Sequence, residues 1–153
     1  MKTLVITNDY FPKKGGISTY IKSFEDHLKF EKIIYAPNWA EGPNVVNSNS
    51  KFIFGSRTHL REINQIINQH NIEIILHASS NPQFYLVDKL KNFGLNQYMI
   101  IHGAEFNVID SIPIVKKIFR GSLESLEKIF TVSYFTGRKL QEITSTEIVL
   151  MGA

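Results

Sequence analysis

A short apolar run near the N-terminus leads into a loop with paired glycines. Leu4–Ile6 has the length and character of a buried parallel strand, and beyond Gly15 and Gly16 apolar residues recur at helical spacing from Ile17 to Phe24. A strand therefore feeds a glycine loop, and the loop feeds the start of a helix. Unpaired N–H groups and the positive end of the helix dipole attract anions at such a point. This predicts a phosphate or diphosphate at Gly15 and Gly16.

The alternative interpretation is that the two glycines only turn a strand into a helix. The chain contains neither the G-x-G-x-x-G motif nor the G-x-x-x-x-G-K-[ST] motif. A dinucleotide or ATP site of either common design is therefore disfavoured, and the loop taken alone favours the plain turn.

Composition describes an ordinary globular domain. The 153 residues fit one domain, and a chain with 43% hydrophobic and 20% charged residues is not a disordered one. The net charge of +3 is too dispersed to indicate nucleic-acid binding. Two tight basic groups occur, at Lys13–Lys14 and at Lys116–Arg120, and we interpret both as solvated surface charge.

The residues that are missing exclude several chemistries. Without cysteine there is no disulfide, no thiolate catalysis and no cysteine-ligated metal. His59 and His70 have no partner at metal-ligand spacing, so we expect packed residues and no metal site. No apolar run approaches the ~20 residues of a membrane span, and no signal peptide precedes the first strand, so we expect a cytoplasmic protein.

Apolar runs alternate with amphipathic segments along the whole chain. This alternation predicts an α/β fold, a doubly wound, Rossmann-like parallel sheet of about six to seven strands with helices on both faces and Leu4–Ile6 central. The expected strands are Leu4–Thr7, Lys32–Tyr35, Phe52–Phe54, Glu73–His77, Tyr98–His102, Ile129–Val132 and Glu147–Leu150. The expected helices are Ile17–Lys29, His59–His70, Pro82–Asn92, Pro113–Leu126 and Tyr134–Ile143.

Residues typical of helix ends and loops mark several boundaries. Asn81 followed by Pro82 predicts a capped helix start, Gly94 predicts a stop, and Ser133 predicts another cap. The polar stretch 37–50 is predicted to be a loop.

Polar clusters follow three of the expected strands, where ligands bind in a doubly wound sheet. They are Asn8-Asp9 with the glycine loop, the segment 77–81, and the segment 102–106. A lone histidine after an apolar run is usually a packed residue. His102 differs because Gly103 and Glu105 follow it directly.

Three motifs in order carry a resemblance to a known family. They are T-N-D-Y-F-P-K-K-G-G-I-S-T-Y at 7–20, I-I-H-G-A-E-F at 100–106 and F-T-V-S-Y-F-T-G-R-K-L at 130–140. Together they span nearly the whole chain. The chain resembles the N-terminal half of retaining glycosyltransferases of family four, in particular the bacterial phosphatidylinositol mannosyltransferases and related sugar-nucleotide enzymes.

The resemblance implies two facing Rossmann-like domains with the active site between them, residues 1–153 being the acceptor-side domain. It implies that Gly15 and Gly16 lie against the donor diphosphate and that His102 contacts the transferred sugar. Glu105 is its companion, although a solvated loop carboxylate is an equal alternative. The acceptor-side candidates are Asn8, Asp9, Lys13 and Lys14.

The resemblance also implies partners. They are a nucleotide-sugar donor and a lipid or glycan acceptor, with peripheral contact at the inner membrane face and no metal or other cofactor. The domain that normally supplies the cationic residues for the diphosphate is absent, and residues 148–153 match the last N-terminal strand and the start of a linker. We therefore expect a chain cut at the linker that is inactive alone.

Position 104 departs from the family pattern, because Ala104 stands where related sequences carry a second histidine. The donor sugar and the acceptor thus stay open, as do two alternative functions. One is a nucleotide-sugar 2-epimerase or glycogen-synthase-like enzyme on the same fold. The other is a small phosphate- or sugar-binding domain that works alone.

Overall fold

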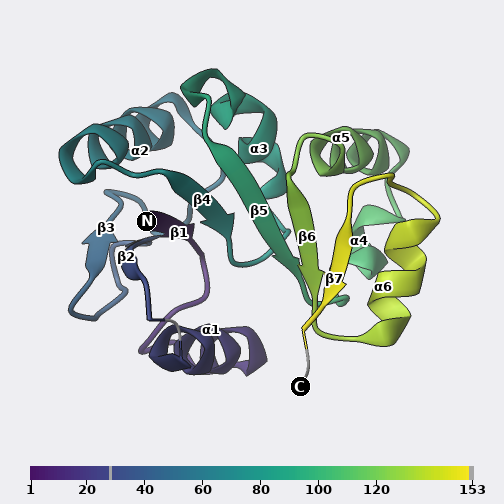
Figure 1. Cartoon of the computed structure of the whole chain (residues 1–153), viewed down its shortest axis with the longest axis horizontal. Coiled ribbons are helices and arrows are strands. Elements are labelled where there is room, and N and C mark those ends of the chain that lie inside the picture. The colour runs from purple at the N-terminus through teal and green to yellow at the C-terminus, as the bar shows by residue number, and fades with distance from the viewer. Residues whose placement is uncertain (28, 152–153) are drawn as a thin grey trace.

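A computed structural model describes residues 1–27 and 29–151, with the side chain of Val108 left out. The described chain forms one parallel sheet of seven strands in the order β3-β2-β1-β4-β5-β6-β7. This confirms the predicted doubly wound α/β fold (Figure 1). The strands are β1 (Lys2–Ile6), β2 (Glu31–Ala36), β3 (Val45–Asn47), β4 (Ile74–His77), β5 (Asn96–Ile101), β6 (Lys128–Thr131) and β7 (Ile148–Leu150).

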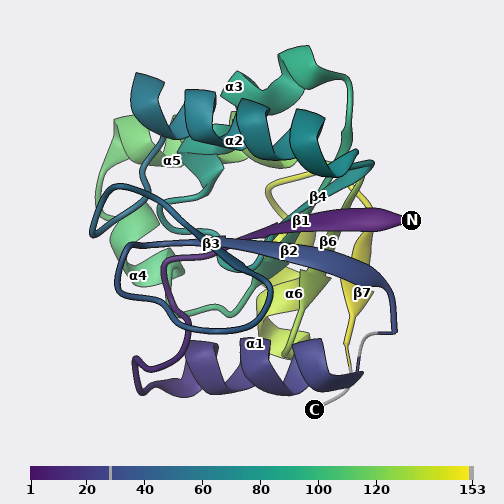
Figure 2. The same ribbon diagram turned by 90° about the vertical axis from the view of Figure 1, so that its left-hand side faces the viewer.

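Helices cover the two faces of the sheet unequally. Among the helices of residues 1–27 and 29–151, α1 lies alone on one face and the others pack on the opposite face (Figures 1 and 2). Beyond α1, the first face keeps an open apolar groove whose lining includes Leu76, Tyr98 and Phe130. The helices are α1 (Gly16–His27), α2 (Arg57–His70), α3 (Phe84–Leu90), the 3-10 turn η1 (Lys91–Phe93), α4 (Phe106–Ile109), α5 (Pro113–Leu123) and α6 (Tyr134–Gln141).

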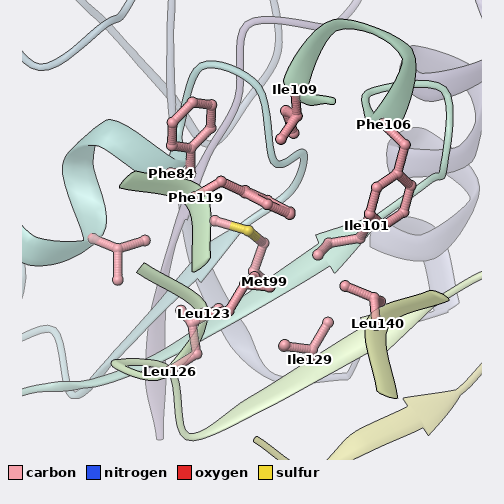
Figure 3. Packing of buried hydrophobic residues seen from close by; sticks show 11 residues of the cluster. Phe84, Met99, Ile101, Phe106, Ile109, Phe119, Leu123, Leu126, Ile129 and Leu140 are labelled. Atoms are coloured by element: carbon pink, nitrogen blue, oxygen red, sulfur yellow. The ribbon is translucent and has the colours of Figure 1, made fainter. Parts of the chain in front are cut away.

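Alternate residues of a strand point to opposite faces of the sheet and contribute to the hydrophobic core on each face. Met99 and Ile101 of β5 face α3 to α6, where Phe119 of α5 packs edge-on against Phe84 and Phe106 (Figure 3). The intervening Ile100 belongs to the core beneath α1. Both faces of the central strands are thus apolar, which is the pattern of a buried parallel sheet.

Local capping explains several helix boundaries. Ser133 caps α6 by accepting a hydrogen bond from the backbone N–H of Thr136, and Gly94 ends η1 in the left-handed conformation, as predicted. The predicted cap at Asn81 is wrong. The chain turns over residues 81–83, and α3 begins only at Phe84, after Gln83.

The third strand is not where the sequence pattern placed it. The segment Phe52–Phe54 alternates exposed and buried side chains, but it bonds to the side chain of Asn8 instead of a neighbouring strand. The edge strand next to β2 is β3, which lies inside the stretch 37–50 predicted to be a loop. Three residues at an edge, flanked by polar residues, leave almost no alternation to detect.

Two further predictions need adjustment. Leu4–Ile6 lies inside the sheet, but the middle of the strand order belongs to β4. Helix α4 was not predicted, because four residues are too few to show helical periodicity. Leu28, within the predicted first helix, and Gly152–Ala153, within the predicted linker, lie outside the described residues.

A buried histidine makes stability depend on pH. His77 is fully buried and its Nε2 atom lies 2.8 Å from Oε1 of Gln97. Burial lowers the pKa of His77 to about 4 from 6.5. Between these values the unfolded chain binds the extra proton, so stability rises with pH. We expect the free energy of unfolding to fall by about 3 kcal/mol as the pH drops from 6.5 to 4.

Chemical denaturation at several pH values measures this effect. His77→Gln should reduce the slope of stability against pH, and His70→Gln, at the half-buried end of α2, is the comparison variant. Burial also lowers the pKa of His59, which adds a smaller slope of the same sign, so the slope should not vanish. An unchanged slope in a folded His77→Gln protein would exclude His77 as the titrating group.

Candidate functional site

Three loops meet at one edge of the sheet, where the parallel strands end. They follow β1 (residues 7–15), β4 (residues 78–83) and β5 (residues 102–105). Figure 2 shows the loop after β1 and helix α4 at this edge, opposite the N-terminus. The three polar clusters singled out in the sequence therefore share the edge at which ligands of open α/β sheets bind.

The ring of His102 is held in one orientation by two contacts. Its Nε2 atom lies 3.1 Å from the backbone carbonyl of Ala78, and the ring meets Tyr20 edge-on at 5.3 Å. Because a carbonyl oxygen only accepts, Nε2 must carry a proton. Nδ1 is then the free atom of the ring, and no other described residue bonds to it. The residue is half-buried, and its predicted contact with a sugar stays a prediction.

Glu105 and Gly103 fix the loop that carries this histidine. The buried carboxylate of Glu105 accepts backbone N–H bonds from His102 at 3.3 Å and Gly103 at 2.6 Å. Gly103 has φ 102°, and a Cβ there would lie 2.4 Å from Oγ1 of Thr136. Each residue of H-G-x-E thus has a physical role. Both carboxylate oxygens of Glu105 are engaged, which gives it a positioning role and not that of a solvated loop carboxylate.

The glycine pair begins α1 without any steric need for glycine. The carbonyl of Gly15 accepts hydrogen bonds from the N–H of Thr19 and the hydroxyl of Ser18. A Cβ on Gly16 would meet no atom within 4 Å, and neither glycine has a left-handed φ. Both residues are exposed. These observations fit a plain turn as well as a ligand site, so the diphosphate at the glycine pair stays a prediction.

The loop after β1 is anchored on both sides. The hydroxyl of Tyr10 donates to the carboxylate of Glu25 on α1, and both residues are buried. Burial and this carboxylate raise the pKa of Tyr10 well above its usual value, so the phenol stays protonated. The backbone of Phe11 accepts from the N–H of Glu41 at 2.9 Å. These contacts set where α1 starts relative to the sheet.

The four predicted acceptor-side residues separate into two kinds. Asn8 is buried, and its side chain exchanges two hydrogen bonds of 2.7 Å with the backbone of Ile53. It therefore holds the loop, and we do not carry it into the acceptor site. Asp9 forms an ion pair with Lys13. Lys14 is exposed and pairs with no acidic side chain of residues 1–27 or 29–151.

The described chain does not enclose these residues in one cavity. A groove lined by Lys13, Lys14 and the outer side of α1 includes neither His102 nor the two glycines. Tyr20, one turn into α1, is the residue that links this helix to His102. Sequence reasoning missed Tyr20 and Ala78, because contacts between distant segments leave no local signal.

Nowhere in the described part of the chain do three or more histidine, aspartate or glutamate side chains gather as a metal site would need. No described helix combines the length and apolar character needed to cross a membrane.

Comparison with known proteins supports the resemblance. The chain is 24% identical over 151 residues to the GDP-mannose-dependent alpha-(1-6)-phosphatidylinositol monomannoside mannosyltransferase of Mycobacterium tuberculosis, covering 88% of this chain and 39% of that protein. The protein of the same name from Mycolicibacterium smegmatis is 24% identical over 147 residues, covering 87% and 38%. The chain thus spans about two-fifths of the length of these curated relatives. No protein-family model matches it.

Solved structures agree on the fold. UGT2 of Phytolacca americana, complexed with UDP-2-fluoro-glucose and pterostilbene, aligns with 99% of this chain and 52% of its own, at TM-score 0.57 and 8% identity. Glycyrrhiza uralensis UGT73P12, complexed with glycyrrhetinic acid 3-O-monoglucuronide, aligns with 98% and 42%, at TM-score 0.50 and 11% identity.

The chain folds as a Rossmann-like domain, and the proteins that it resembles in sequence belong to the glycosyltransferase class. Within that class, the relatives found by sequence are mannosyltransferases named for a phosphatidylinositol lipid.

Proposed function

We propose that residues 1–153 are the acceptor-side domain of a retaining glycosyltransferase. The enzyme would move a mannose- or glucose-like sugar from a nucleotide-sugar donor to a lipid or glycan acceptor. The observation that carries this proposal is the His102 loop, in which a half-buried ring is held through Nε2 and no described residue bonds to Nδ1. The similarity to GDP-mannose-dependent mannosyltransferases supports the donor class.

The open start of α1 suits the donor diphosphate. Its first N–H groups and the helix dipole favour negative charge, and the two glycines let phosphate oxygens approach the backbone. Fixed backbone N–H groups of this kind stabilise the negative charge that develops on the leaving diphosphate. The chemistry then needs no metal ion, provided that cationic side chains of a facing domain complete the site.

His102 suits the transferred sugar. Nδ1 can accept a hydrogen bond from a sugar hydroxyl, because Nε2 carries the proton that Ala78 accepts. In the front-face mechanism that we assign, the leaving phosphate oxygen takes the proton of the acceptor hydroxyl. The domain then contributes position and charge, and no protein nucleophile is required.

The acceptor would lie beside the loop after β1. Lys14 offers an unpaired positive charge there, and the ion pair of Asp9 and Lys13 fixes the loop around it. An acceptor with an anionic group, such as a lipid phosphate, matches this arrangement. Residues 1–153 alone leave the site open to water, where each charge contact is worth little.

Calorimetry on two versions of the protein tests this proposal. Residues 1–153 alone should fold, bind GDP-mannose or UDP-glucose weakly, and transfer no sugar. The same chain extended through its downstream reading frame should bind one donor tightly and turn over. Tight, saturable donor binding by residues 1–153 alone would instead support a stand-alone binding domain. Inversion at C2 of the donor sugar without transfer would support an epimerase.

A further inference from the structure

Exposed isoleucines gather on the outer surface of α5 and the residue before it. The exposed fractions are 45% for Ile112, 62% for Ile114 and 37% for Ile118. Ile114 and Ile118 lie four residues apart, so they are neighbours on one side of the helix. Isoleucine is among the residues that folded proteins most often bury, and here three lie together at the surface.

Basic residues border this apolar strip. Lys117 and Arg120 are exposed, lie three residues apart, and pair with no acidic side chain in the described ranges 1–27 and 29–151. Lys116 is paired with Asp110 at 3.0 Å. Residues 112–123 contain three basic residues and no acidic one. The sequence alone suggested plain surface charge, because it does not show that the isoleucines beside it are exposed.

The opposite side of α5 anchors it firmly. Phe119 and Leu123 are buried in the core shared with α3, α4 and α6 (Figure 3). The exposed isoleucines are therefore not needed to hold the helix in place. A helix with buried anchors, an outer apolar strip and a positive border can lie in the plane of a bilayer interface.

The position of α5 relates this surface to the candidate site. Helix α4 lies at the edge where the strands end, and α5 starts four residues after α4 ends (Figure 2). Helix α4 follows directly on the loop of His102, and α5 is the next helix along the chain. A membrane in contact with Ile112 and Ile114 would therefore lie next to the edge that carries His102.

We propose that this α5 surface, formed by Ile112, Ile114, Ile118, Lys117 and Arg120, docks on an anionic phospholipid bilayer. The inference deepens the proposed function and rests on it only for the expectation of a lipid acceptor. The isoleucines enter the interfacial region, and the two unpaired cations lie against lipid phosphates. Each such cation typically strengthens binding about fivefold, and salt weakens this part.

Co-sedimentation with vesicles tests the docking surface. The probe is a vesicle of phosphatidylglycerol and phosphatidylcholine in equal parts, with pure phosphatidylcholine as the neutral comparison. Lys117→Gln with Arg120→Gln should weaken binding to the anionic vesicles by about 25-fold. Ile114→Asn with Ile118→Asn should weaken it at least tenfold. Circular dichroism and thermal melting check that each variant is folded.

Variants on α2 and in the segment before it control for charge and for apolar exposure elsewhere. Arg57→Gln with Arg61→Gln removes two exposed charges from a helix on the same side of the sheet, and Phe52→Asn removes an exposed apolar side chain. Both proteins should bind as the unmodified chain does. Binding by the α5 variants equal to that of the unmodified chain, loss of binding in the control variants, or no binding to anionic vesicles would each overturn the inference.

The result is separable from the proposed function. If the extended protein transfers sugar to a detergent-dispersed acceptor but docks on no vesicle, the docking surface fails and the enzyme assignment stands. If it docks through α5 yet transfers no sugar to any acceptor, the enzyme assignment fails and the docking surface stands.

Discussion

Replacing His102 by alanine in the extended protein is expected to lower the rate of sugar transfer about 10²–10³-fold. The ring is locked by Ala78 and Tyr20, so its open Nδ1 is already in position before substrate binds. A contact of this kind strengthens as charge develops in the transition state, and its loss appears mainly in kcat. The melting temperature should change little, because the ring is half-buried and bonds to one carbonyl.

Two further substitutions identify the nitrogen that matters. His102→Asn keeps a polar group near the position of Nδ1, and His102→Gln keeps one near the position of Nε2. If Nδ1 contacts the sugar, the asparagine variant should recover part of the activity that alanine loses, and the glutamine variant should not. His70→Ala serves as the control, since His70 ends α2 and is not part of the site. Full activity in a folded His102→Ala protein would refute the assignment.

Gly16→Val should be nearly as damaging, by about 10²-fold in transfer, while the domain still folds. A Cβ at this position meets nothing within 4 Å of the chain, so valine causes no internal clash. It would instead occupy the space through which diphosphate oxygens approach the helix start. Donor affinity from calorimetry and initial rates of transfer measure the effect.

A second glycine provides the matched control for this substitution. Gly121 lies in helix α5 and, like Gly16, would place a Cβ in open space. Gly121→Val makes the same substitution in another helix, away from the proposed diphosphate, and it should leave donor binding unchanged in a detergent assay. Equal donor affinity in Gly16→Val and the unmodified protein would show that the glycine pair only forms a turn and does not bind the diphosphate.

The sequence predicted the parts of the fold that rest on continuous apolar runs or on a repeated amphipathic pattern. Buried runs such as Leu4–Ile6 and Ile74–Leu76 are apolar on both faces, and the amphipathic pattern of α2 and α5 repeats over several turns. It failed where a tertiary contact decides the structure. The side chain of Asn8 forms hydrogen bonds with both the N–H and the carbonyl of Ile53, so the segment Phe52–Phe54 stays outside the sheet.

The candidate site shows the same division. His102, Gly103 and Glu105 adjoin in sequence, so their motif was visible, and the structure adds what each one does. The partners Tyr20 and Ala78 come from other elements and carry no local signal. Asn8 shows the opposite case. It is a polar residue at a strand end whose side-chain oxygen and nitrogen both form hydrogen bonds within the fold.

The most direct test of the central claim is the product formed by the extended protein. It is incubated with GDP-mannose or UDP-glucose and with a phosphatidylinositol-type acceptor, and the acceptor is analysed by mass spectrometry and by NMR of the new glycosidic bond. The account predicts a gain of one hexose with the anomeric configuration of the donor retained. An inverted linkage would contradict the retaining mechanism. No transfer by a folded, donor-binding protein to any lipid or glycan acceptor would contradict the assignment as a glycosyltransferase.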